Sequence, residues 1–460
     1  MSRRGAYTLL AAACALPRLA ILLHERAAIT SAFTEKSDTF ALTFVQHGTF
    51  GYVPGEPSAY TQPLYGWFLV PVYWIFGRSW ESIGLAQLVL AVLVAWLVYE
   101  IGRRVLGRRA GLIAAAIATL NPYLAWHDMH VNREIVDQVC ATALVLLTLR
   151  VAERPSKRLA VLLGVVTGMA MLGNTRLVFV PVLCAAYLAW RLPRTRATAA
   201  VTALVLAGAA VAVTPWLARN EVSVGCLAIT TDGRALWKAN NTQTYALLSS
   251  GRWIDNVATN SPRPAPPNQL TPEDAYGYYT KPGVGLQYAQ AHYPSECVEM
   301  SFYEHLATQY VKHHPGGKVK LAALSEQLLW QPNVFETTGR NGRGTGLDVG
   351  RRVVEPIYMW VVYALAAIGL FMAPRAFVAL ALLLFAYQSA CAALFVGATR
   401  YRIAWDFLLA LLAAAAVVGA GFALIPVVGY LEALAVPLFG LRLRRRTPDR
   451  HAGLRTLARD

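Results

Sequence analysis

Residues 82–102 read SIGLAQLVLAVLVAWLVYEIG, an apolar run with a single acidic residue and no basic one. A helix needs about 20 mostly apolar residues to cross a bilayer, because the hydrocarbon layer is roughly 30 Å thick and each residue rises about 1.5 Å. This run therefore predicts a membrane-spanning helix.

Nine further apolar runs have the same character. They cover residues 7–27, 110–126, 135–152, 158–173, 176–190, 199–216, 353–373, 376–397 and 403–424. Hydrophobic residues make up 56% of the 460 residues and charged residues 15%, against about 25% charged in an ordinary soluble domain. A last apolar piece, 425–441, is expected to lie at the interface or to re-enter the membrane, with an eleventh span as the alternative. The sequence predicts an all-α polytopic membrane protein with ten to eleven transmembrane helices.

The net charge of +16 is explained by basic residues that gather in alternate connections between the spans. With ten spans, these connections all lie on one side, which the positive-inside rule makes cytoplasmic. The charge therefore indicates membrane topology, and no nucleic-acid partner is expected. The opposite, external side receives the loops 28–81, 127–134 and 217–352.

This topology divides the chain into four parts. Residues 1–216 form an N-terminal membrane module that includes the external loop 28–81. Residues 217–352 form an external loop subdomain, residues 353–441 the C-terminal membrane helices, and residues 442–460 a basic cytoplasmic tail.

The six cysteines separate into two groups. Four lie within predicted spans, where a thiol behaves as a small apolar side chain: Cys14, Cys140, Cys184 and Cys391. Cys226 and Cys297 lie in the long external loop, where an oxidising compartment would allow them to pair. The sequence leaves open whether they do.

Carboxylates beside membrane spans are candidates for catalysis, because charge at that depth is costly to keep without a function. Asp38 precedes a helical pattern in the loop 28–81, and an N-cap is the alternative role. Asp128 and Glu134 lie in the second external loop, for which a solvated turn is the alternative. Glu134 and Asp137 share one face of the following helix. The candidate catalytic residues are Asp38, Glu134 and Asp128.

Two further kinds of site are considered. Arg176, Arg219, Arg400, Tyr401 and Arg402 are candidates for binding a phosphate, because a planar guanidinium donates two parallel hydrogen bonds. Snorkelling to lipid headgroups is the alternative role for Arg400 and Arg402. A divalent metal is also considered, with ligands from His127, His130 and Glu134.

Six short motifs follow one another along the chain. They are SDTFALTFVQHGTFGYVPGEPSAYTQPLYGWFL (37–69), NPYLAWHDMHVNREIVDQV (121–139), NTRLVFVP (174–181), TPWLARN (214–220), LWKANN (236–241) and ATRYRI (398–403). In this order they resemble the GT-C membrane glycosyltransferases, specifically relatives of the bacterial protein O-mannosyltransferases and the lipid A aminoarabinose transferase. One departure lies at Ser37-Asp38, where many relatives carry Asp-Glu.

The resemblance implies a sugar donor linked to a polyprenyl phosphate and bound at the external face of the plasma (inner) membrane. It implies transfer with inversion to a hydroxyl of a protein, lipid or glycan acceptor. Such a hydroxyl needs a general base, and Asp38, at the external end of the first span, is the foremost candidate. A secondary transporter and an O-antigen ligase or polymerase are the alternatives. A transporter would place its charges near mid-bilayer, whereas here they gather at the external ends of spans.

Overall fold

Helices make up the regular secondary structure of the part of the chain that the structure describes, apart from one isolated bridge between Val53 and Glu56. The structure is a computed structural model, and it describes residues 3–31, 35–254, 257, 295–333 and 345–420. The predicted all-α class is confirmed. The predicted piece 425–441 and the tail 442–460 lie outside the described residues.

Seven of the described helices are long and apolar enough to cross a membrane. They are α1 (Arg3–Glu25), α5 (Trp80–Val105), α8 (Glu134–Glu153), α11 (Arg196–Ser223), the Val353–Met372 part of α18 (Thr345–Met372), α19 (Arg375–Leu394) and the span Thr399–Ala420. Each coincides with a predicted run. The protein is therefore a multi-pass membrane protein.

Three other predicted runs form shorter helices, α6 (Arg108–Thr119), α9 (Lys157–Gly173) and α10 (Val180–Arg191). With 12 residues each, α6 and α10 reach only about 18 Å, less than the hydrocarbon thickness. The run 110–126 breaks because Asn121 caps a new short helix, α7 (Pro122–His127), by accepting hydrogen bonds from the backbone of Tyr123 and Leu124. Pro122 suits the first position of that helix.

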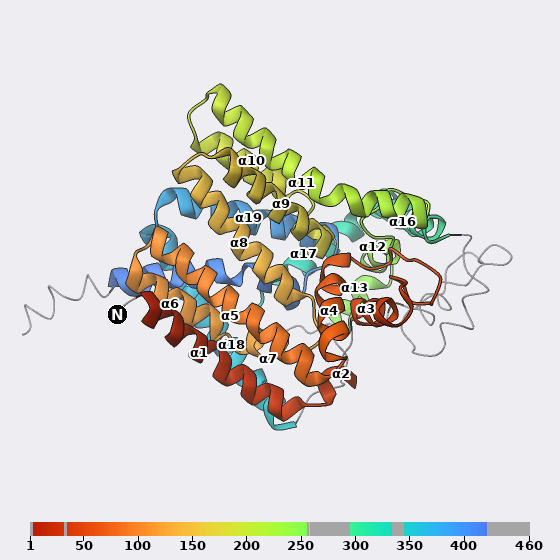
Figure 1. Cartoon of the computed structure of the whole chain (residues 1–460), viewed down its shortest axis with the longest axis horizontal. Helices are drawn as coiled ribbons and strands as arrows, with labels where there is room; N and C mark the ends of the chain where they lie inside the picture. Colours follow the sequence, from red (N-terminus) through yellow and green to blue (C-terminus); the bar gives the residue numbers. More distant parts are fainter. Residues whose placement is uncertain (1–2, 32–34, 255–256, 258–294, 334–344, 421–460) are drawn as a thin grey trace, which may run out of the picture. The chain divides into compact units, whose positions relative to one another are not determined.

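Glycines bring α9 and α11 into close contact. A Cβ added to Gly164 would lie 2.4 Å from the backbone oxygen of Val205, and one added to Gly168 would lie 2.7 Å from that of Ala209. Small residues four apart allow two backbones to approach, which is a common way for membrane helices to pack. Figure 1 shows α9 and α11 side by side, next to α8 and α10.

The ends of three spans meet at one end of the helix bundle. Arg3 at the start of α1 pairs with Glu100 near the end of α5 at 2.9 Å, and Arg104 pairs with Glu153 at the end of α8 at 3.0 Å. The opposite ends of these helices therefore lie together as well. That second end leads into the loops 28–81 and 127–134, in agreement with the predicted topology.

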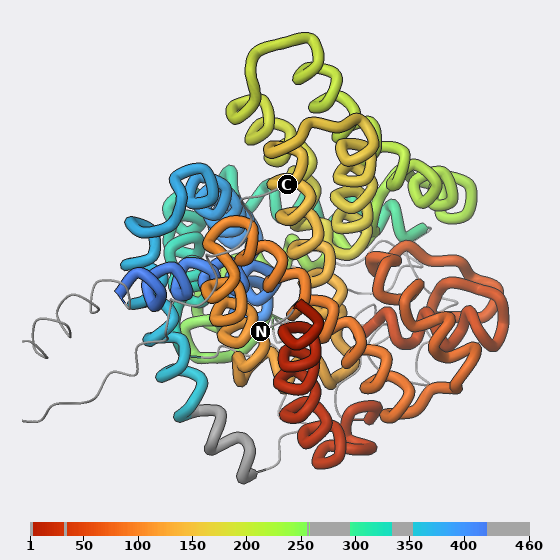
Figure 2. Tube along the Cα trace, turned by 60° about the vertical axis from the view of Figure 1, so that its left-hand side comes forward, coloured from red at the N-terminus to blue at the C-terminus, as the bar shows by residue number. Residues whose placement is uncertain are grey.

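The first external loop forms α2 (Ala28–Ser31), α3 (Lys36–His47) and α4 (Pro63–Phe76), and packs against the end of α11. The Trp216 ring contacts the rings of Phe50 and Trp67 with centroids 5.7 and 5.6 Å apart. Figures 1 and 2 both show this loop, in red to orange, beside the end of α11, in yellow-green. The loop is thus tied to the membrane helices.

The described part of the long loop has its own apolar core. It forms α12 (Gly233–Ala239), α13 (Thr244–Ser249), α16 (Glu296–His313) and α17 (Pro315–Trp330). Trp237, Leu248 and Tyr303 lie in the core, together with Val396 and Ala398 from the segment after α19. Cys226 and Cys297 form a disulfide that joins the start of this loop to α16. The loop therefore packs directly onto the segment that leads into α20 (Thr399–Arg402) and η3 (Ile403–Trp405).

Candidate active site

The second external loop is buried. Residues 123–132 are all shielded from solvent, so the solvated turn considered for this loop is wrong. The loop ends at Glu134, the first residue of α8, at the end of the bundle opposite the Arg104–Glu153 pair. Glu134 and Asp137 are both buried in the first turn of α8, as their spacing predicts.

Glu134 pairs with Arg400 from α20. The Nε and Nη2 atoms of Arg400 both lie 2.5 Å from Oε1 of Glu134. The Glu134 side chain is only 4% exposed and that of Arg400 only 12%. The other carboxylate oxygen of Glu134, Oε2, has no hydrogen-bond partner among the described residues. The structure thus joins two predicted site residues that are far apart in the sequence.

A second pair lies beside the first. The Nε atom of Arg133 is 3.4 Å from Oε1 of Glu35, the residue that precedes α3, and Arg133 also donates from Nη1 to Gln62. Burial raises the pKa of the Glu35 carboxyl, while the positive charge of Arg133 opposes that rise and the negative charge of Glu134 adds to it. Neither Arg133 nor Glu35 is among the site residues predicted from the sequence.

Arg176 and Asp137 complete the cluster. The Arg176 guanidinium lies 3.2 Å from the ring centroid of Tyr401, and its Nη1 atom has no hydrogen-bond partner in the described part of the chain. Oδ2 of Asp137 accepts from Asn174 at 2.9 Å, whereas Oδ1 is without a partner there. Arg176 lies within electrostatic range of both Arg133 and Arg400.

Five buried polar atoms of this cluster have no hydrogen bond among the described residues. Among the described residues, the buried side-chain atoms of the cluster that lack a hydrogen bond are Glu35 Oε2, Arg133 Nε, Glu134 Oε2, Asp137 Oδ1 and Arg176 Nη1. A native protein leaves few buried polar groups unpaired, so several in one place indicate an incomplete site that a ligand can satisfy. We refer to Glu35, Arg133, Glu134, Asp137, Arg176 and Arg400 as the polar cluster.

Asp38 lies in a different environment. Its Oδ1 accepts from the Tyr73 hydroxyl at 2.5 Å and from Nε of Arg78 at 2.9 Å, and its Oδ2 accepts from Nη2 of Arg78 at 2.7 Å. Arg78 also donates to the backbone oxygen of Thr30 at 2.9 Å. Glu35, not Asp38, is the N-cap residue of α3. Asp38 therefore ties α3 to the end of α4 with both oxygens occupied.

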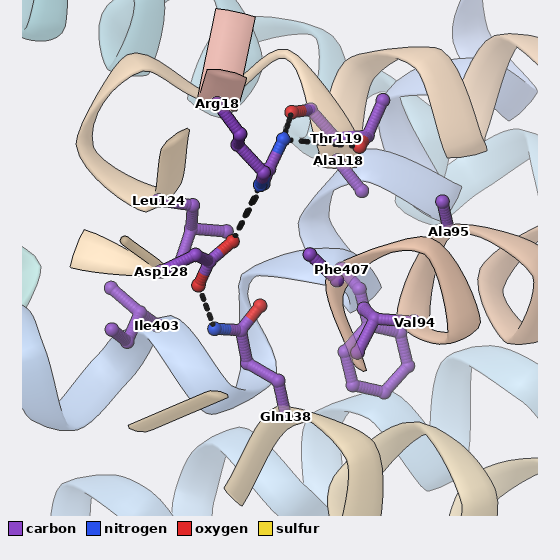
Figure 3. Close-up of a pocket in the computed structure, with 11 residues that line it drawn as sticks. Arg18, Val94, Ala95, Ala118, Thr119, Leu124, Asp128, Gln138, Ile403 and Phe407 are labelled. Atoms are coloured by element: carbon purple, nitrogen blue, oxygen red, sulfur yellow. Dashed lines mark hydrogen bonds and ion pairs between the residues drawn. The ribbon is translucent and has the colours of Figure 1, made fainter. Parts of the chain in front are cut away.

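Asp128 is also fully paired. Arg18, in α1, donates to Oδ2 of Asp128 at 2.6 and 3.0 Å, and Gln138 donates to Oδ1 at 2.9 Å (Figure 3). Arg18 further donates to the backbone oxygen of Thr119 at 2.8 Å. These four polar residues line a cavity of about 10 Å³, which has room for a single water molecule. This geometry anchors the second loop to α1.

The remaining predicted phosphate ligands are occupied by the protein. Arg402 donates to Asp406 at 2.9 Å and to the backbone oxygens of Leu329 and Gln331 at 2.8 and 3.2 Å. Arg219 donates to the backbone oxygens of Ser58 and Phe50 at 2.9 and 3.0 Å. Of the five residues predicted to bind a phosphate, the structure brings Arg176, Arg400 and Tyr401 together.

The three residues considered as metal ligands point to different partners. His127 contacts Asn132, His130 stacks on Trp126 with centroids 3.7 Å apart, and Glu134 pairs with Arg400. Within the described residues, no group of three or more His, Cys, Asp or Glu side chains is arranged to hold a metal ion.

A further charged network joins the two large external loops. Lys36 pairs with Asp232 at 2.6 Å, and Arg234 lies 3.3 Å from Glu299. Burial raises the pKa of the Glu299 carboxyl to about 7 although Arg234 opposes the rise. Glu296 accepts hydrogen bonds from the backbone of Ala59 at 3.0 Å and from Thr231 at 2.8 Å. The network holds the first loop against the long loop.

The predicted resemblance to GT-C membrane glycosyltransferases is supported by a family model that matches part of the chain. The particular family whose model matches is "Dolichyl-phosphate-mannose-protein mannosyltransferase", over residues 56–218. This match includes the second external loop, Arg176 and the start of α8, but not α3 or α20. No curated protein matches the chain.

Two solved structures match most of this chain at low sequence identity. ArnT from Cupriavidus metallidurans, crystallised with undecaprenyl phosphate, is 15% identical, with 90% of this chain and 78% of that chain covered and a TM-score of 0.41. The oligosaccharyltransferase of Archaeoglobus fulgidus, tethered to an acceptor peptide, is 12% identical, with 87% and 49% covered and a TM-score of 0.47. The chain spans about half the length of the second enzyme.

Proposed function

We propose that this protein transfers a sugar from a polyprenyl-phosphate-linked donor to an acceptor hydroxyl at the external face of the plasma membrane, with inversion at the sugar carbon. The observation that carries the proposal is the polar cluster, where three arginines and three carboxylates meet at the end of the bundle opposite the basic end. The matching family supports it, because its name specifies a sugar carried by a polyprenyl phosphate.

Arg176 and Arg400 are the proposed ligands of the donor phosphate. Arg176 presents an Nη1 atom that has no partner among the described residues, and its guanidinium carbon lies 3.2 Å from the centroid of the Tyr401 ring. Arg400 adjoins the same ring, with its guanidinium carbon 5.6 Å from the centroid. Positive charge in a partly buried site stabilises the negative charge that develops on a departing phosphate. Because the site lies beside membrane helices, the polyprenyl chain of the donor can remain in the lipid bilayer.

Glu134 is the proposed base. In the transfer step the acceptor oxygen forms a bond to the sugar carbon, and its proton moves to the Glu134 carboxylate. The bond between the sugar carbon and the phosphate oxygen breaks, and the lipid phosphate leaves with the electron pair. Attack opposite the leaving phosphate inverts the sugar carbon. Oε2 of Glu134, which lacks a partner among the described residues, is the atom proposed to accept the proton.

Asp38 and Asp128 are proposed to position this site. Both have two occupied carboxylate oxygens, and each is held by an arginine, Arg78 for Asp38 and Arg18 for Asp128. Because both oxygens of each carboxylate already accept hydrogen bonds from the protein, neither residue presents an open oxygen to an acceptor hydroxyl. The competing assignment makes Asp38 the base. Variants of Asp38 and of Glu134 distinguish the two assignments.

The test is transfer by the purified protein from defined polyprenyl-phosphate sugars. Lipid that co-purifies is first identified by mass spectrometry, and the product is then analysed for the configuration at its sugar carbon. The proposal expects a polyprenyl phosphate or its sugar adduct in the preparation and an inverted product. Absence of both bound polyprenyl lipid and transfer, in protein that unfolds cooperatively, would contradict it.

A further inference from the structure

The Glu134 carboxylate occupies the side of Arg400 that is best suited to bind a phosphate. The Nε and Nη2 atoms define one planar edge of a guanidinium, and both lie 2.5 Å from Oε1 of Glu134. Phosphate binds to the same two-donor edge. An anionic ligand that uses this edge must therefore displace Glu134.

The charges of the polar cluster make this competition unavoidable. Arg133, Arg176 and Arg400 face Glu35, Glu134 and Asp137, so the cluster holds as many formal negative charges as positive ones when its carboxylates are ionised. A phosphate adds negative charge to a site that is already balanced. A phosphate that binds to Arg400 is accommodated without excess negative charge on that arginine if Arg400 exchanges its carboxylate for the ligand. Arg400 has the shortest such contact.

Displacement also changes the chemistry of Glu134. An arginine at hydrogen-bond distance holds a carboxylate in place and stabilises its charge. Once Arg400 has turned to a phosphate, Glu134 loses that stabilisation, while Oε2 already lacks a partner in the described part of the chain. The freed carboxylate then presents both oxygens to the acceptor hydroxyl.

We propose that the donor phosphate displaces Glu134 from Arg400, so that donor binding itself releases the base. The inference rests on the proposed function in assigning a lipid phosphate to Arg400. It adds that Glu134 is a competitor of the donor before it is the base of the reaction. The ion pair therefore holds the carboxylate on Arg400 until a donor is bound.

This exchange predicts an unusual effect of removing the base. Glu134→Gln removes the competing charge from Arg400, so the variant should bind undecaprenyl phosphate about tenfold more tightly than the wild type while losing sugar transfer. A tenfold gain corresponds to about 1.4 kcal/mol. Binding is measured by native mass spectrometry or calorimetry in one detergent at fixed ionic strength. Arg400→Gln should weaken binding of the same lipid.

Asp137→Asn is the matched control. It removes a carboxylate of the same cluster that is bonded to Asn174 instead of an arginine. It therefore reports the general effect of one less negative charge, and Glu134→Gln should exceed it severalfold. Glu134→Asp provides a second variant, because it keeps the charge but retracts the carboxylate by one methylene. It should bind the lipid more tightly than the wild type and less tightly than Glu134→Gln.

The outcomes separate this inference from the proposed function. Glu134→Gln protein that binds undecaprenyl phosphate no better than Asp137→Asn would overturn the exchange, even if the wild type binds the lipid and transfers sugar. If Glu134→Gln does not fold, equal binding by Glu134→Asp and the wild type overturns it. A wild type that neither binds the lipid nor transfers sugar would overturn the proposed function and the exchange with it.

Discussion

Two buried arginine–carboxylate pairs lie near the two ends of the second external loop, and they differ in how completely they are satisfied. Arg18 and Asp128 lie in contact at 2.6 Å, and Gln138 and the Thr119 backbone provide further hydrogen bonds. Arg400 and Glu134 lie at 2.5 Å, but Oε2 of Glu134 has no partner among the described residues.

The comparison distinguishes a structural pair from a functional one. Burying two charges is costly, and the cost is offset only where good geometry and additional hydrogen bonds satisfy both groups. The Arg18–Asp128 pair meets that condition and locks the loop to α1. The Arg400–Glu134 pair does not, which is expected of a site that a ligand completes.

The largest predicted effect breaks the structural pair. Asp128→Leu leaves the Arg18 guanidinium buried without its carboxylate and should cost about 3–5 kcal/mol of stability. The double variant Arg18→Met with Asp128→Leu replaces the pair by apolar side chains and should recover most of that loss. Thermal unfolding in detergent measures both. A single variant as stable as the wild type would show that the pair does not anchor the loop.

Asp38→Asn extends the comparison to a third arginine–carboxylate pair, Arg78 with Asp38. An amide cannot accept from Tyr73 and both nitrogens of Arg78 as a carboxylate does, so we expect a stability loss of about 1–3 kcal/mol. Arg78→Gln should produce a similar loss, because it breaks the same contacts. Transfer by Asp38→Asn protein, corrected for the folded fraction, should stay within about tenfold of the wild type. A folded variant slowed on the order of a hundredfold or more would make Asp38 the base.

The smallest predicted effect is the pH dependence of the network between the loops. The pKa of Glu299 is raised to about 7 in the folded protein, above its ordinary value of 4.5, chiefly by burial. The folded state therefore binds this proton more tightly than the unfolded chain does, and the associated stability is lost as the pH rises from about 4.5 to 7. Glu299→Gln should flatten the fall in unfolding temperature between pH 5 and 8. If the unfolding temperature of the variant falls with pH as steeply as that of the wild type, Glu299 is not the cause of the pH dependence.

Much of the fold could be predicted because the bilayer imposes a length and a polarity on each span. Ion pairs could be predicted only between residues that are close together in the sequence. Arg402 and Asp406 are four residues apart on one helical segment, so an i,i+4 pair was readable from the sequence. Arg18 interrupts the first span, and an arginine there requires a partner, but nothing in the sequence identifies that partner as Asp128.

The candidate site shows the same limit. The spacing of Glu134 and Asp137 placed both on one face of α8, as the structure has them. Glu35 and Arg133 were not selected, because loops of this kind contain many charged residues and sequence alone does not show which are buried. In the structure these two residues are recognised by buried side-chain atoms that lack a hydrogen bond among the described residues and lie close to Glu134.

The most direct test of the account is sugar transfer by the Glu134→Gln variant. The folded protein, shown to bind undecaprenyl phosphate, is assayed with a polyprenyl-phosphate sugar donor next to the wild type and the Asp38→Asn variant. The account predicts that Glu134→Gln loses transfer by on the order of a hundredfold or more, because an amide cannot take the acceptor's proton. Near-normal transfer by this variant would contradict the assignment of the polar cluster as the catalytic site.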